Sequence, residues 1–94
     1  MSAPIIEKIP EDARDVVIRI PSGTSYPDGG FKLYVPPARK IYAAAARIAA
    51  YGYDVIVTYS GNVVTIKVYD RSAGAELSAG TSLPGDVEVL LKVV

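Results

Sequence analysis

The chain of 94 residues contains no cysteine and no histidine, and its single methionine is the first residue. Without cysteine the protein can form neither disulfides nor thiolate nucleophiles. Without histidine it lacks the commonest general base and the commonest metal ligand. We therefore expect no enzymatic activity, no metal site and no cofactor.

An excess of charge of one sign and long hydrophobic runs are also missing. Lysine and arginine together number 10, as do aspartate and glutamate, so the formal net charge is zero. The overall charge thus gives no indication of a nucleic acid or an acidic membrane as partner. No apolar run reaches the length of a membrane span, and the N-terminus lacks the apolar core of a signal peptide. We expect a cytoplasmic protein without membrane contact.

Glutamine and tryptophan are absent too, while 50% of the residues are hydrophobic. Hyperthermophile proteins avoid glutamine, cysteine and methionine, and designed proteins often share that avoidance together with regular patterning. The composition therefore agrees with either a hyperthermophile or a de novo origin. The length and the lack of a low-complexity tract predict one α/β domain, residues 15–94, after an N-terminal arm, residues 1–14.

The stretch from Pro36 to Asp70 carries the clearest pattern. Its first half has apolar residues spaced three and four apart, as on the buried face of a helix. These residues are Ile41, Ala44, Ala45, Ile48 and Ala49. Pro37 suits the first turn of a helix, and Gly52 suits the left-handed residue that ends one. We therefore predict a helix between these two positions.

The second half of this stretch predicts a β-hairpin. Residues 55–60 and 63–69 alternate in character and are joined by Gly61-Asn62, a two-residue hairpin loop. This loop pairs Ser60 with Val63 and brings the inner residues of the two strands together on one face. These are Val55, Val57, Tyr59, Val64, Ile66 and Val68. A slip of one residue would bury Lys67, so the pattern fixes the register.

Three further strands are predicted at residues 16–20, 31–35 and 87–94. The last is apolar on both faces, which is typical of a central strand. Residues 22–30 read as the oversized loop of a hairpin between the first two strands, with Tyr26 partly tucked in. Residues 71–86 have no periodicity and read as a surface crossover.

The element order is thus ββαβββ, which predicts an α+β fold: a two-layer α/β sandwich with one helix packed on a mostly antiparallel five-stranded sheet. In the arrangement that we favour, the last strand runs parallel to the first and also neighbours the hairpin that follows the helix. This arrangement is β-grasp-like, and a ferredoxin-like arrangement is the alternative.

The sheet face opposite the helix is the candidate site, because strand alternation fixes its members. It mixes aliphatic, tyrosine and basic residues and is too apolar for a simple solvated surface. We interpret it first as the contact surface of a non-catalytic interaction or assembly module, which self-associates as a homodimer. The residues expected to make this contact are Val17, Ile56, Val63, Leu90 and Val94.

Two other interpretations of this face stay open. In one, the protein binds single-stranded nucleic acid, with Tyr34 and Tyr69 stacking on bases and basic residues meeting phosphates. The basic residues are Arg19, Lys32, Lys67 and Lys92. In the other, the N-terminal arm of the same chain covers the face, which then has only a structural role.

Overall fold

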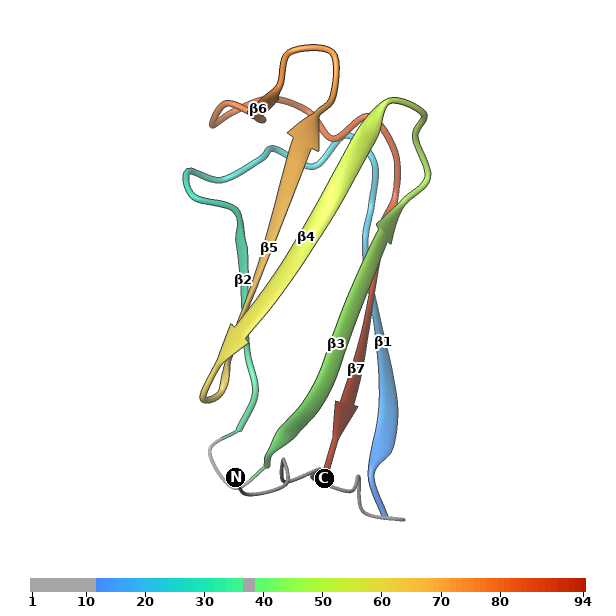
Figure 1. Cartoon of the computed structure of the whole chain (residues 1–94), viewed down its shortest axis with the longest axis vertical. Helices are drawn as coiled ribbons and strands as arrows, with labels where there is room; N and C mark the ends of the chain where they lie inside the picture. Colours follow the sequence, from blue (N-terminus) through green and yellow to red (C-terminus); the bar gives the residue numbers. More distant parts are fainter. Residues whose placement is uncertain (1–11, 37–38) are drawn as a thin grey trace, which may run out of the picture.

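The computed structural model describes residues 12–36 and 39–94, which form two antiparallel β-sheets packed face to face (Figure 1). The first, here called the β7 sheet, has the strand order β1 (Arg14–Ile20), β7 (Val87–Val93), β3 (Ile41–Ile48). The second, the β5 sheet, has the order β2 (Phe31–Tyr34), β5 (Val63–Asp70), β4 (Tyr53–Ser60). A short strand, β6 (Ala75–Glu76), also pairs with the end of β5.

The core lies between the two sheets and is centred on their middle strands, β7 and β5. Every second residue of these strands faces inward, as the alternation of a strand requires. The inward residues are all 3% exposed or less: Val87, Val89, Leu91, Val93, Val64, Ile66 and Val68. Most are β-branched, and such side chains pack well on a pleated surface.

The predicted helix is wrong, because its central residues form β3, and the described residues contain no helix. Ala44, Ala46 and Ile48 lie opposite Leu91, Val89 and Val87 and face the core with them. Alanine fits a helical or an alternating pattern equally well, so the spacing alone could not decide. The segment has no N-cap residue to favour a helix, whereas pairing with β7 satisfies the backbone groups on one side of the strand.

The predicted strand arrangement is also wrong, so the fold is neither β-grasp-like nor ferredoxin-like. β1 runs antiparallel to β7, not parallel to it, and β1 and β2 belong to different sheets. The neighbours of β7 are β1 and β3, not the β4–β5 hairpin. Without a helix to cover the apolar face of one sheet, a second sheet must cover it, and the predicted single sheet divides into two.

Two predictions about the strands are confirmed. β4 and β5 pair in the predicted register, with Ser60 opposite Val63 and Val57 opposite Ile66. Gly61 has a φ of 57°, as the first residue of a type II′ hairpin loop requires. β7 is central in its sheet, as its two apolar faces indicated.

The loop before β2 and the segment before β7 are bound to each other. Gly23 N donates to Leu83 O and Leu83 N to Thr24 O, both at 2.9 Å, while Tyr26 N donates to Thr81 O at 2.8 Å. Residues 22–30 are therefore not the tip of a hairpin, and Tyr26 is buried instead of partly tucked in.

The hydroxyl of Tyr26 connects this loop region to the β5 sheet. It donates to Glu76 Oε2 at 2.5 Å and accepts a hydrogen bond from Val68 N at 3.1 Å. Burial, and then the hydrogen bond to Glu76, raise the pKa of the Tyr26 phenol far above its ordinary value. The phenol thus stays protonated and can act as both donor and acceptor.

Two sequence predictions fall partly or wholly outside the described residues. Pro37, expected in the first turn of the helix, is one, and residues 1–11 of the N-terminal arm are the other. The division of the chain into an arm and a domain stays a prediction.

We predict that Tyr26→Phe lowers the free energy of unfolding by roughly 1–3 kcal/mol, because it leaves the buried Val68 N–H without an acceptor. Tyr51→Phe is the matched control, since Tyr51 is almost fully exposed, and it should change stability by less than about 0.5 kcal/mol. Urea denaturation followed by circular dichroism measures both. Equal stabilities of the two variants would contradict the role assigned to the Tyr26 hydroxyl.

Candidate association surface

The outer face of the β7 sheet, here called the β7 face, is ordered in three rows that run across the strands. The register places Val17, Leu90 and Ala45 side by side in the middle row. On one side of it lie Arg19, Glu88 and Arg47, and on the other Asp15, Lys92 and Ala43. The β7 face therefore has an apolar centre between two rows that carry charges.

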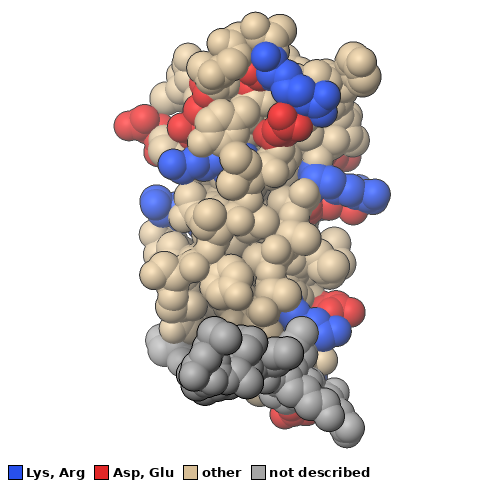
Figure 2. All heavy atoms as spheres, viewed as in Figure 1, with Lys and Arg blue, Asp and Glu red and all other residues tan. Residues whose placement is uncertain are grey.

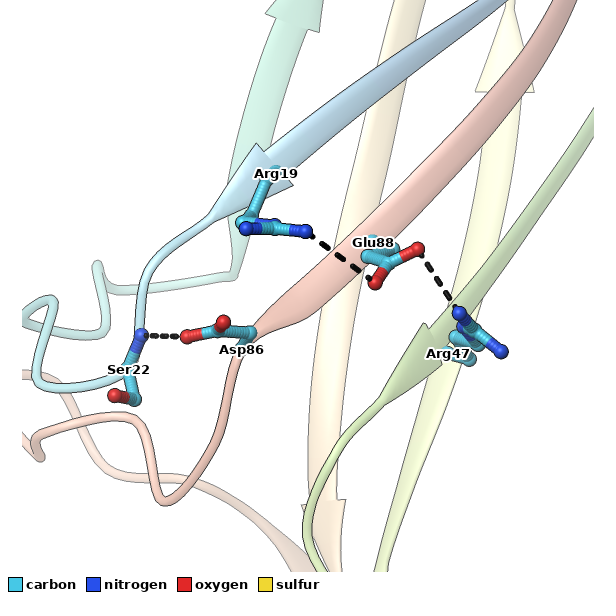
Figure 3. A network of polar contacts seen from close by, with 5 residues as sticks. All are labelled: Arg19, Ser22, Arg47, Asp86 and Glu88. Carbon is cyan, nitrogen blue, oxygen red and sulfur yellow. Dashed lines mark hydrogen bonds and ion pairs between the residues drawn. The ribbon is translucent and has the colours of Figure 1, made fainter.

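Ion pairs connect the charged side chains within each of the two outer rows. Glu88 accepts a hydrogen bond from Arg47 Nη2 at 3.1 Å on one oxygen, and its other oxygen lies 3.9 Å from Arg19 Nη2 (Figure 3). In the opposite row Lys92 Nζ lies 3.0 Å from Asp15 Oδ1. These pairs are solvent-exposed, so each contributes at most about 1 kcal/mol to stability. Their effect is to neutralise most of the charge on the β7 face.

A further hydrogen bond joins the segment that follows β1 to the residue that precedes β7. Ser22 N donates to Asp86 Oδ1 at 2.8 Å, at the end of the sheet where β1 leaves it (Figure 3). Asp86 thus has a turn role, and no functional group of the β7 face depends on it.

The middle row is open to solvent. Val17 is 64% exposed and Leu90 is 45% exposed, although β7 is the central strand. The small side chain of Ala45 leaves a hollow of about 320 Å³ beside Leu90, lined also by Val17 and the stems of Arg47 and Glu88. Isolated apolar side chains are normal on a surface, whereas a continuous row with a hollow is typical of a contact site.

The outer face of the β5 sheet, here called the β5 face, is more polar. Its middle strand presents Val63, Thr65, Lys67 and Tyr69 in turn. Thr58 and Lys32 flank Thr65, and Ile56 lies opposite Lys67. The apolar side chains are therefore interrupted by threonine and lysine, and they form no continuous row.

The structure separates the residues that we predicted to bind a partner. Val17 and Leu90 lie together on the β7 face, whereas Ile56 and Val63 lie on the β5 face. The inner sides of the two sheets pack on each other, so these two faces point in opposite directions (Figure 1). Val94 follows the end of β7, is half-buried, and donates its N–H to Lys40 O at 3.1 Å.

The residues predicted to bind nucleic acid are separated in the same way. Lys32, Tyr34, Lys67 and Tyr69 share the β5 face. Arg19 and Lys92 lie on the β7 face, in the ion pairs with Glu88 and Asp15 described above. Only two of the four predicted cations therefore accompany the two tyrosines.

Sequence reasoning missed the contribution of β3 to the β7 face. Ala45 was assigned to the buried side of a helix, so its place beside Leu90 was not foreseen. The signal that could have shown it is the alternation of Ala44, Ala46 and Ile48. If this segment is taken as a strand, these three residues pair with the inward residues of β7.

A second hollow, of about 400 Å³, opens between the two sheets beside β1 and β2 and is lined mostly by apolar residues, among them Val16, Leu33 and Leu91. Acidic and basic side chains lie close together along the flanks in the view of Figure 2. No cluster of three or more potential metal-ligating residues occurs in residues 12–36 and 39–94. The same part of the chain contains no helix that is long and apolar enough to cross a membrane. No protein-family model, curated protein sequence or solved structure matches the chain.

Proposed function

We propose that this protein is a non-catalytic association module that forms a homodimer through the β7 face. The observation that carries the proposal is the exposed apolar row of Val17, Leu90 and Ala45, which crosses all three strands of the sheet. Burying such a row removes apolar surface from water, the main driving force of protein association. The cytoplasmic setting expected from the sequence is kept as part of this proposal.

The charges around the row suit the rim of an interface. Interfaces commonly have an apolar centre depleted of charge and a polar rim. Asp15, Arg19, Arg47, Glu88 and Lys92 lie beside the row and outside it, mostly paired with one another. A partner could therefore cover Leu90 without stranding an unpaired charge, which would be costly.

The β5 face supports a second candidate function, the binding of single-stranded nucleic acid. Tyr34 is 75% exposed and shares this face with Lys32 and Lys67. An exposed aromatic ring beside cations is the arrangement that stacks bases and meets phosphates. We rank this candidate second because Arg19 and Lys92 lie on the opposite face of the molecule.

The homodimer is tested with a matched pair of substitutions. Leu90→Lys should break the face contact and lower the mass of the assembly, because the new charge would be buried in the contact. Ile56→Lys is the control: Ile56 is 49% exposed, about as much as Leu90, but lies on the β5 face. Light scattering over a concentration series should show the wild-type mass for Ile56→Lys and a lower mass for Leu90→Lys.

A wild-type protein that stays monomeric at all concentrations would overturn the homodimer, and so would a Leu90→Lys variant that keeps the wild-type mass. Circular dichroism verifies that the variants fold. If Leu90→Lys does not fold, Ala45→Lys takes its place, because Ala45 is exposed in the same row and lies on β3, away from β1.

The second candidate predicts weak, salt-dependent binding of a labelled single strand in fluorescence anisotropy. With only Lys32 and Lys67 meeting phosphates, the slope of log K against log salt should be near −1.4, at about −0.7 for each phosphate. Tyr34→Ala should cost roughly 1–3 kcal/mol without changing the slope, and Tyr51→Ala should have no effect. Absence of binding at low salt would eliminate this function.

A further inference from the structure

In the part of the chain that the structure describes, β1 is an edge strand of the β7 sheet, and one of its two sides is free to pair with another strand. β1 pairs with β7 along all seven of its residues, and no strand among the described residues pairs with its other side. Natural edge strands are usually protected by a proline, a bulge or a charge pointing inward. β1 has one such feature, Arg14, which lies on the inward side at its first residue. From Asp15 to Ile20 the edge is unprotected, since the inward residues there are Val16, Ile18 and Ile20.

The exposure of Val16 indicates that something can cover this edge. Val16 lies on the inner side of the sheet, opposite Leu91, yet it is 38% exposed. Leu91 itself is buried. Val16 lines an open hollow of about 400 Å³ between the two sheets, together with Ile18 and Leu33, so this aliphatic side chain on the inner side reaches water at the β1 edge.

We propose that two copies of this chain join through their β1 strands, which pair antiparallel about a two-fold axis at Val17. The β7 sheets of the two copies then form one continuous six-stranded sheet. This inference deepens the proposed function and rests on it in one respect, namely that the combined outer face is a contact surface. The β1 contact itself is separate from the contact made by Leu90.

The charges of β1 select one register. A two-fold axis perpendicular to the sheet keeps both cores on the same side, so inward residues must pair with inward residues. The register centred on Val17 sets Asp15 opposite Arg19 of the second copy, twice by symmetry, and Val16 opposite Ile18. Centring on Val16 sets Asp15 opposite Val17, and centring on Ile18 sets Arg19 opposite Val17. Only the Val17 register pairs opposite charges, which stabilise neighbouring strands.

This pairing extends the rows of the β7 face across both copies. The middle row becomes continuous through Ala45, Leu90 and Val17 of one copy into the same residues of the second copy. The charged row runs from Arg47 through Glu88 and Arg19 to Asp15 and Lys92 of the second copy, and its signs alternate throughout. Each neighbour in the row thus attracts the next.

The area of the combined face also favours the pairing. Three strands about 4.8 Å apart and about 23 Å long cover only about 300 Å². A stable interface buries about 800 Å² of accessible surface on each partner, so the contact through the β7 face gains stability when two such faces are joined. Joining two of them doubles the continuous surface and adds backbone hydrogen bonds at the β1 edge.

Cysteine cross-linking tests the β1 contact, since the chain has no cysteine of its own. Facing residues of paired strands have Cβ atoms about 5 Å apart. Residues on two stacked faces can approach almost as closely, so the test is made in a Leu90→Lys background, where the face contact is removed. Val17→Cys should therefore form a disulfide-linked dimer in a glutathione buffer. Ile56→Cys, exposed to a similar degree on the β5 face, is the control and should stay unlinked.

The register is tested by charge exchange. Asp15→Arg alone and Arg19→Asp alone should each weaken dimerisation about tenfold, because each places like charges opposite one another twice. An equal mixture of the two variants should restore the dimer, since both contacts between unlike copies are then attractive. Sedimentation equilibrium measures all three samples, and circular dichroism verifies their folding.

Each outcome decides one of the two contacts. Val17→Cys that cross-links no more than Ile56→Cys overturns the β1 pairing, and the Leu90→Lys experiment then judges the face contact alone. Cross-linking together with an unchanged mass of Leu90→Lys supports the β1 pairing and overturns the face contact. A mixture of charge variants that stays monomeric overturns the Val17 register.

Discussion

The alternation of side chains along β7 is the constraint on which the rest of the structure depends. Its inward residues, Val87 to Val93, are covered by the β5 sheet, and its edges are covered by β1 and β3. Leu90, in the centre of the strand, points outward and stays exposed. A leucine at this position contributes nothing to the core, so burial between the sheets does not explain its apolar side chain. The proposed association explains it.

Local patterns were enough to predict the parts of the fold that depend on neighbours in sequence. The register of the β4–β5 hairpin is fixed by its two-residue loop and by Lys67, which a slip of one residue would bury. Both signals lie within the hairpin. The central place of β7 followed from its two apolar faces. In each case the residues that decide the structure are those of the element itself.

The predictions were wrong where the structure of a segment depends on contacts with residues far away in the sequence. Alanines 43–46 fit either secondary structure, and only pairing with β7, some forty residues later, makes them a strand. Alternation shows which residues share one face of a strand, but not which strands share a sheet. For that reason the single predicted face divided into the β7 face and the β5 face. Tyr26 was underestimated because its partners, Glu76 and Val68, lie far along the chain.

Amide hydrogen exchange at low and at high protein concentration tests most directly the central proposal, namely that copies of the chain meet through the β7 sheet at β1. The account predicts that amides of β1 exchange more slowly at high concentration, while amides of β2 and β4 in the β5 sheet are unchanged. Slower exchange in β2 or β4 with no change in β1 would contradict it.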